Sequence, residues 1–218
     1  MTVILGIDEA GRGSVIGPMF LAGVLIDKKH ENKLRKIGVK DSKLLTPLQR
    51  KSLYSRIKKI AKDYVSLKIS AKEIDELRKT TNLNKIEAEK MAQIIKTMKA
   101  DIAYVDAPQA STEKFKRILL ALAKNNTEIV AENYADLKFP VCSAASIIAK
   151  FERDREIEKI KKIVGFDFGV GYSHDSRSIE FVKKCLKEKK HLEFIRHSWI
   201  TVNNIISEKE QKTLKEYK

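Results

Sequence analysis

The stretch Gly6-Ile7-Asp8-Glu9-Ala10-Gly11-Arg12-Gly13 follows the apolar run Val3-Ile4-Leu5, and it constrains the fold more than any other segment. The apolar run predicts a buried strand over Val3–Asp8, which ends where two carboxylates meet two glycines. Carboxylates at a strand end suit a divalent cation, and the glycines let the backbone approach a ligand closely. This strand end must therefore lie at an accessible edge of a sheet.

A large excess of positive charge surrounds these acids. Lysine and arginine number 44 and the acids 29 among 218 residues, which gives a formal net charge of +15. Such a charge favours polyphosphate partners and makes binding depend on salt, although many basic proteins bind none. An acidic strand end within a cationic chain indicates metal-dependent chemistry on a polyanion.

The cysteines and apolar runs bear on where the protein works. Cys142 and Cys185 match no metal-binding or redox spacing, which predicts reduced, buried thiols in a cytoplasmic protein. We expect no signal peptide, and runs such as Met19–Ile26 are too short to span a membrane. The high charge favours a monomer.

Strand and helix patterns alternate along the chain. Strand patterns cover residues 3–8, 19–27, 65–69, 102–106 and 128–131. Helix patterns follow the capping boxes Thr46-Pro47-Leu48-Gln49 and Ser70-Ala71-Lys72-Glu73, the first with its apolar face at Leu48, Leu53, Ile57 and Ile60. Others cover residues 83–98, 112–123, 143–163, 178–189 and 201–217. This alternation predicts an α/β fold, and the glycine-containing link between the first two strands predicts an antiparallel pair within a mixed sheet.

Two further acids follow strands. Asp106 ends one strand pattern, and Asp136 comes shortly after the next. Ligands of open α/β sheets bind beyond the carboxyl ends of strands, so Asp8, Glu9, Asp106 and Asp136 can form one site for Mg²⁺ or Mn²⁺. Neighbouring residues of a strand point to opposite faces, so Asp8 and Glu9 share a site only if the strand ends between them. Each acid alone could equally cap a turn or helix, but the set within a basic chain favours a metal site.

The glycines after the first strand also resemble part of a dinucleotide-binding fingerprint. Gly11-Arg12-Gly13-Ser14-Val15-Ile16-Gly17 has the spacing G-x-G-x-x-x-G, whereas the fingerprint is G-x-G-x-x-G and must open a helix. Pro18 and a strand pattern follow instead, which argues against a dinucleotide cofactor.

Six motifs occur in the order typical of ribonuclease HII, the type 2 ribonucleases H, and the chain resembles the archaeal members from about residue 3 to 203. The motifs are residues 6–13, Asp41-Ser42-Lys43-Leu44, Tyr104-Val105-Asp106, Ala135-Asp136, residues 143–150 (SAASIIAK) and Gly169-Val170-Gly171-Tyr172. One departure is Ser14, where proline is common in the family, and we expect it to have little effect. The resemblance implies an RNase H-like fold, with a central mixed sheet flanked by helices. We assign residues 1–175 to its catalytic domain and residues 176–218 to a helical C-terminal extension.

The resemblance also implies an activity. It is that of a metal-dependent endoribonuclease, which cleaves the RNA strand of RNA/DNA hybrids and single ribonucleotides in duplex DNA during replication and repair. Two Mg²⁺ or Mn²⁺ ions would support a reaction that leaves 5′-phosphate and 3′-hydroxyl ends. The family's metal-binding catalytic acids match Asp8, Glu9, Asp106 and Asp136. Its loop that contacts the ribose 2′-hydroxyl matches Gly11, Arg12 and Gly13, and its tyrosine that packs on the junction nucleotide matches Tyr172.

Basic residues offer further substrate contacts. Lys43, Lys150 and Arg153 are candidates for contacting phosphates, although each could equally be a solvated charge. His174-Asp175 suggests a metal-binding pair, but no other histidine has a suitable spacing. Trp199 is expected to anchor the C-terminal part.

The C-terminal end carries a weaker motif. Gln211, Leu214 and Tyr217 partly match the sliding-clamp-binding box, which is glutamine-x-x-aliphatic-x-x-aromatic-aromatic, with Lys218 in place of the second aromatic residue. The same spacing fits the end of an ordinary amphipathic helix.

Two other functions stay open. A two-metal nuclease of the same fold could act on DNA, although the Gly11–Gly13 loop and Tyr172 argue against it. A nucleic-acid-binding protein could have kept a vestigial site, although the presence of all four acids argues against decay.

Overall fold

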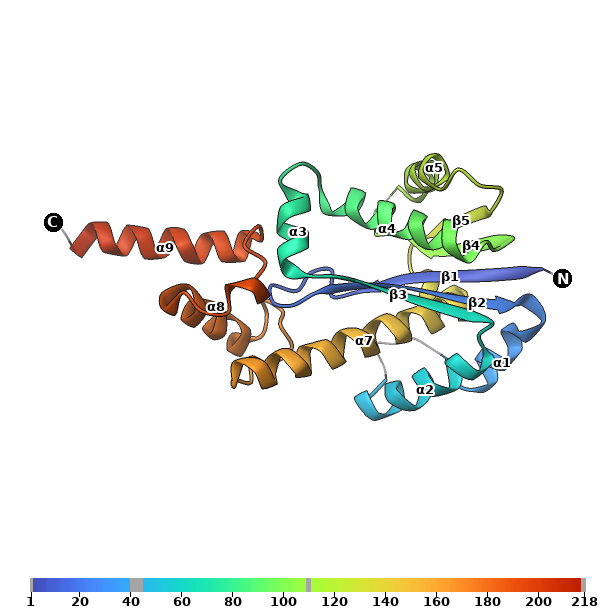
Figure 1. Ribbon diagram of the computed structural model, residues 1–218, viewed down its shortest axis with the longest axis horizontal. Helices are drawn as coiled ribbons and strands as arrows, with labels where there is room; N and C mark the ends of the chain where they lie inside the picture. Colours follow the sequence, from blue (N-terminus) through green and yellow to red (C-terminus); the bar gives the residue numbers. More distant parts are fainter. Residues whose placement is uncertain (1, 40–44, 109–110, 217–218) are drawn as a thin grey trace. The chain divides into compact units, whose positions relative to one another are not determined.

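A five-stranded mixed sheet organises the fold. The computed structural model describes residues 2–39, 45–108 and 111–216, with side chains through residue 208. The strands are β1 (Val3–Ala10), β2 (Met19–Asp27), β3 (Asp63–Ile69), β4 (Ile102–Asp106) and β5 (Glu128–Glu132). Their order is β3-β2-β1-β4-β5 (Figure 1). β1 pairs antiparallel with β2 and parallel with β4, and β4 pairs parallel with β5, so the predicted mixed sheet is confirmed.

Helices fill most of the remaining chain. They are α1 (Glu31–Lys36), α2 (Pro47–Ile60), α3 (Ala71–Arg78), α4 (Leu83–Met98), α5 (Thr112–Ala123), α6 (Ala135–Lys138), α7 (Pro140–Val164), α8 (Ser176–Glu188) and α9 (Ile200–Glu216), with the 3-10 turns η1 (Lys28–His30) and η3 (Leu192–Phe194). Both predicted capping boxes form, at Thr46–Gln49 and Ser70–Glu73. α1 and α6 were not predicted, because they are too short to show a helical period. Within the described ranges, no helix has the length and apolar character needed to cross a membrane.

Contacts divide the chain into two units. The first contains Met1–Ala10, Phe20–Lys68 and Asn82–Arg153, and the second contains Gly11–Met19, Ile69–Thr81 and Asp154–Lys218. The two units interleave in sequence, since the chain passes from one to the other directly after Ala10. The assignment of residues 1–175 to a catalytic domain stays a prediction.

Both faces of the sheet in the first unit are covered. Ile4, Ala22, Val24 and Ile26 share an apolar cluster with the first half of α7 and with Leu53 and Ile57 of α2. On the other face, a Cβ added at Gly23 would lie 2.6 Å from Ile94 of α4. Figure 1 shows α4 and α5 on one side of the strands, and α2 with the start of α7 on the other. Leu48, predicted for the apolar face of α2, is 81% exposed, because it lies in the first turn and away from the sheet.

Gly6 explains how β1 and α7 come close together. A Cβ at this position would lie 2.2 Å from the carbonyl carbon and oxygen of Val141, and these backbone atoms cannot move aside cheaply. Only glycine allows this approach. The start of α7 therefore packs against β1 just before the strand reaches Asp8.

The second unit has its own apolar core. Its centre contains residues from the segment after β1, from the end of α7, from the loop that follows α7 and from α8, namely Val15, Ile16, Ile157, Ile160, Phe168, Phe181 and Val182. Two isolated bridges, Ser14–Tyr172 and Ile16–Ile195, tie residues 14–16 to distant parts of the chain. The second unit thus places the loop Gly11–Gly13 beside the segment that carries Tyr172.

Candidate active site

Two of the predicted acids lie at the carboxyl ends of neighbouring parallel strands. The β1–β4 ladder ends at the pair Ile7–Val105, so Asp8 and Asp106 are the next residues of adjacent strands. Asp8 is only 4% exposed, while Glu9 and Asp106 are half-buried. Ligands of open α/β folds bind beyond the carboxyl ends of the strands, and these acids lie at those ends.

The prediction that β1 ends between Asp8 and Glu9 was wrong. The strand continues to Ala10, because β2 goes on pairing with it through Glu9–Leu21 and Ala10–Phe20. On the other side of β1 the parallel ladder with β4 has already ended, so Asp8 and Glu9 lie beyond its last pair, Ile7–Val105. The carboxylate of Asp8 turns toward its own backbone and accepts the Glu9 N–H at 2.7 Å.

The acids interact strongly with one another. Burial raises the pKa of Asp8 well above its usual range, and the charges of Glu9 and Asp106 raise it further. Hydrogen bonds from Ser146 of α7 and from the Glu9 N–H act in the opposite direction. The ionised cluster is therefore an unfavourable concentration of negative charge, which a divalent cation would neutralise.

A short turn after β5 positions Asp136. Tyr134 adopts a left-handed conformation, with φ 58°, and the following Ala135 N–H donates to Oδ1 of Asp106 at 2.9 Å. Asp136 comes next, in α6, and is 7% exposed. Three of the acids are close enough to affect the Cys142 thiol. Burial raises the pKa of this thiol, and the charges of Asp8, Asp106 and Asp136 raise it further. All four predicted acids thus belong to one region of the first unit.

The donor chemistry fits a hard cation. Among the residues that the structure describes, no three His, Cys, Asp or Glu side chains are gathered closely enough to hold an ion by themselves. Carboxylate oxygens are nevertheless ligands that Mg²⁺ and Mn²⁺ prefer, and Mg²⁺ keeps several waters and uses few carboxylates together with substrate phosphate. The predicted buried state of Cys142 and Cys185 is confirmed, and both are free thiols.

The loop Gly11–Gly13 has a defined backbone conformation. Gly11 has φ 82°, a left-handed value that favours glycine, and its carbonyl accepts the Ser14 hydroxyl at 2.9 Å. A proline at position 14 could not donate that bond, so the departure from the family pattern adds a local contact. Gly13 is exposed, and a Cβ added to it would meet only Cε1 of Tyr172, at 4.0 Å. The ring of Tyr172 therefore flanks the loop.

A network of ion pairs holds the segment that carries Tyr172. Arg177 pairs with Asp167 at 3.1 Å and with Asp175 at 3.0 Å, and Asp175 accepts the Val170 N–H at 3.1 Å. The Arg177 hydrogen bond lowers the pKa of Asp175 to about 2. The ring of His174 stacks on Tyr172 with centroids 5.6 Å apart. His174 and Asp175 thus stabilise the segment that carries Tyr172, and their contacts are structural.

The basic candidates lie in different surroundings. Lys150 is half-buried on α7, one turn beyond Ser146 and on the same side of the helix. Arg153 is only 6% exposed, so it is not a solvated surface charge. Lys43 and its motif, together with Tyr217, lie outside the described residues, as do the side chains of Gln211 and Leu214.

Sequence reasoning missed Arg196. This arginine is fully buried and donates to three backbone carbonyls of residues 11–17. No local pattern marks it, and the only signal is a charged residue next to the apolar pair Phe194-Ile195. The predicted anchor Trp199 lies beside it, with the guanidinium carbons of Arg78 and Arg196 at 4.7 and 4.8 Å from its ring centroid.

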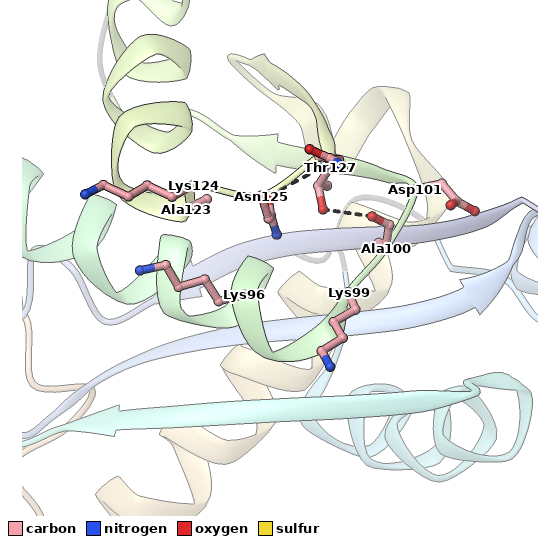
Figure 2. A pocket seen from close by; sticks show the side chains of 9 residues that line it. Lys96, Lys99, Ala100, Asp101, Ala123, Lys124, Asn125 and Thr127 are labelled. Carbon is pink, nitrogen blue, oxygen red and sulfur yellow. Dashed lines mark hydrogen bonds between the residues drawn. The ribbon is translucent and has the colours of Figure 1, made fainter.

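A hollow elsewhere in the first unit is not part of this site. It measures about 540 Å³ and is lined by residues near the ends of α4 and α5, including Lys96, Lys99, Asp101, Lys124 and Thr127. Figure 2 shows Thr127 hydrogen-bonded to Ala100 and Asn125 at its wall. The hollow lies where β4 and β5 begin, whereas the acids lie where β1 and β4 end.

Comparisons with known proteins identify the family of this chain. The family model for ribonuclease HII matches residues 5–202. The chain belongs to the ribonuclease HII family. The ribonuclease HII of Pyrococcus furiosus is 45% identical over 92% of this chain and 89% of its own length. The protein is therefore an endoribonuclease of the ribonuclease H class, which is a hydrolase.

Solved structures support the same fold. The ribonuclease HII in a complex with PCNA from Archaeoglobus fulgidus is 43% identical, with a TM-score of 0.84 over 90% of this chain and 95% of that one. The ribonuclease H2 of Pyrococcus horikoshii is 40% identical, with a TM-score of 0.87 over 94% and 97%. A Bst-RNase HIII in complex with Mn²⁺ is 19% identical, with a TM-score of 0.78 over 94% and 70%, and shares the fold. The predicted RNase H-like fold is confirmed.

Proposed function

We propose that this ribonuclease HII cleaves the RNA strand of RNA/DNA hybrids and single ribonucleotides within duplex DNA. Asp8, Glu9, Asp106 and Asp136 would hold two Mg²⁺ or Mn²⁺ ions. The observation that carries the proposal is the mutual repulsion of Asp8, Glu9 and Asp106 at the carboxyl ends of β1 and β4. Negative charges beside a buried carboxylate are costly unless a cation is bound to the group. The Mn²⁺ complex of the distant RNase HIII adds support from a protein of the same fold.

The protein's own residues orient the acids for this role. The Ser146 hydrogen bond and the Glu9 N–H hold the Asp8 carboxylate, and the Ala135 N–H holds that of Asp106. Carboxylates fixed in this way do not have to reorganise when substrate binds. When bound, the ions would activate a water and stabilise the leaving 3′-oxygen, which gives 5′-phosphate and 3′-hydroxyl ends.

The loop Gly11–Gly13 would recognise the ribose. The 2′-hydroxyl is the group that distinguishes RNA from DNA, and it is accessible in the wide minor groove. Gly13 carries no side chain and is exposed, so a sugar can approach its backbone directly. The ring of Tyr172 lies next to Gly13 and would pack against the same nucleotide. Lys150, and Lys43 by family resemblance, would contact phosphates.

The decisive experiment uses two duplexes of one sequence. One is all DNA and the other carries a single ribonucleotide, and each is incubated with Mg²⁺, Mn²⁺ or EDTA. We expect one cut, 5′ of the ribonucleotide, which is lost in EDTA and in Asp8→Asn. Cleavage of the all-DNA duplex would identify a DNA nuclease instead. Tight binding without cleavage of either duplex would identify a nucleic-acid-binding protein.

We also propose that the C-terminal end binds a sliding clamp through Gln211, Leu214 and Tyr217. The support is the partial box motif and the existence of a PCNA complex for the Archaeoglobus fulgidus relative. A pull-down with an archaeal clamp should capture the full chain and not a chain that lacks residues 211–218. Capture of both, or of neither, would remove this proposal and leave only an amphipathic helix end.

A further inference from the structure

Arg196, in the second unit, is the largest fully buried side chain among the described residues, and it is hydrogen-bonded to the recognition loop, residues Gly11–Gly13. Its exposed fraction is 0%. Nη2 donates to the Gly11 carbonyl at 2.7 Å, Nη1 to the Arg12 carbonyl at 2.8 Å and Nε to the Gly17 carbonyl at 3.0 Å. These three bonds gather the two ends of one short segment around a single guanidinium.

A buried guanidinium requires substantial compensation. Removing a cation from water costs several kcal/mol unless hydrogen bonds and other contacts replace the lost hydration. Three carbonyl acceptors and the face of Trp199 provide that replacement. Arginine suits this position because its planar fork points several N–H groups in fixed directions, which lysine does not.

The bonds set the direction of two peptide planes. In a planar trans peptide the C=O and the following N–H point to opposite sides. Because the carbonyls of Gly11 and Arg12 are turned toward Arg196, the N–H groups of Arg12 and Gly13 are turned away from it. Arg196 therefore determines which way the donors of the recognition loop point.

Arg196 is itself held by a second set of contacts. Its backbone N–H donates to the Val15 carbonyl at 3.0 Å. The next two residues are fixed by Asp75 of α3, which accepts the N–H of His197 at 2.7 Å and both the N–H and the hydroxyl of Ser198, at 3.0 and 2.6 Å. The guanidinium is thus presented to the loop from a rigid segment.

We propose that Arg196 is a positioning residue for substrate recognition. By binding the carbonyls of Gly11, Arg12 and Gly17, it holds the loop amides in the orientation that engages the 2′-hydroxyl of the substrate. This inference rests on the proposed function, because it concerns the loop that distinguishes a ribonucleotide from a deoxyribonucleotide.

The test compares Arg196→Met with Arg78→Met. Both variants remove a guanidinium from the ring of Trp199, but only Arg196 hydrogen-bonds the loop carbonyls. KM and kcat are measured on the single-ribonucleotide duplex, and the all-DNA duplex serves as a competitor that gives Ki. Partial unfolding lowers only the apparent kcat, so the ratio of Ki to KM isolates recognition.

We expect Arg196→Met to lower the ratio of Ki to KM about tenfold, the loss expected for one hydrogen bond. Arg78→Met should leave the ratio unchanged. An unchanged ratio in Arg196→Met would overturn the inference. A wild-type ratio near one would instead refute the proposed ribose recognition, and the spectroscopic test below would then decide the role of Arg196 by itself.

A second measurement covers the case in which Arg196→Met does not fold. Glycine-selective ¹⁵N labelling reports on the nine glycines of the chain. In Arg196→Lys, which keeps the charge but loses the fork, we expect the Gly11, Gly13 and Gly17 resonances to shift while those of Gly38 and Gly165 stay. Unshifted loop glycines would overturn the inference.

Discussion

Replacing Gly13 by alanine should separate substrate recognition from folding. The added Cβ would meet only Cε1 of Tyr172 at 4.0 Å, an ordinary van der Waals distance, and the backbone of Gly13 is not left-handed. A compatible Gly→Ala change stabilises a protein by about 0.4–1 kcal/mol, because the unfolded chain loses freedom. For a chain of this length that corresponds to a rise in Tm of about 1–4 °C. The folded protein should therefore tolerate the substitution.

The substrate should not tolerate it. The new methyl group stands on an exposed loop residue, where the proposal places the sugar of the ribonucleotide. Displacing the sugar would lose about one hydrogen bond and add a steric cost, together about 1.4–2.8 kcal/mol, or a 10- to 100-fold lower kcat/KM. Steady-state cleavage of the single-ribonucleotide duplex measures this loss, and thermal melting measures the stability.

Gly165 provides a matched control with the opposite expected result. Its φ of 65° strains any other residue, although its Cβ would enter open space. Gly165→Ala should lower the free energy of unfolding by about 1 kcal/mol and keep kcat/KM per folded molecule. If Gly13→Ala cleaves the duplex as well as the wild type does, the ribose does not approach this loop and the argument fails.

Other consequences follow from the charges. Because the pKa of Asp8 is raised in the fold, the metal-free protein should lose stability as pH rises from about 3.9, and this loss should be absent in Asp8→Asn. Melting in EDTA from pH 4 to 8 checks this, and parallel curves of the two proteins would contradict it. The pKa of Asp175 is lowered to about 2, so its contribution to the free energy of unfolding is present above about pH 3.9 and is lost as pH falls to about 2. Asp175→Asn should therefore make Tm less dependent on pH in this range, and it should raise KM because the Tyr172 segment is held less firmly. Lys150→Gln should raise KM several-fold and lower the salt dependence of binding by about one ion, whereas Lys99→Gln, at the opposite edge of the sheet, should change neither; equal effects of the two would show that only net charge matters.

The sequence predicted those parts of the fold that depend on local pattern. β2, α4 and α5 have the predicted bounds, because apolar periodicity and caps determine them without distant contacts. The acids were found from their places at strand ends, and the parallel pairing of β1 with β4 then brings Asp8 and Asp106 together.

Contacts between distant segments could not be predicted in this way. The predicted end of β1 was wrong because β2 goes on pairing with β1 after the pairing with β4 has ended. No property of residues 3–10 reveals this longer pairing. The role of Arg196 depends on carbonyls that precede it by 179 to 185 residues. A single sequence contains no local signal for such a contact. Asp75 and Trp199 come close to Arg196 and its neighbours only in the folded chain.

We propose that Asp8, Glu9, Asp106 and Asp136, which lie at or shortly after the ends of β1, β4 and β5, form the metal-binding centre. The most direct measurement is a calorimetric titration of the protein with Mn²⁺, with Asp8→Asn and Asp106→Asn compared with Glu128→Gln. Glu128 is an exposed acid at the start of β5, the end of that strand opposite to Asp136, so it is a matched loss of one charge. We expect Mn²⁺ binding to be weakened at least tenfold in both aspartate variants and unchanged in Glu128→Gln. Equal binding by all four proteins would show that the ions are held elsewhere.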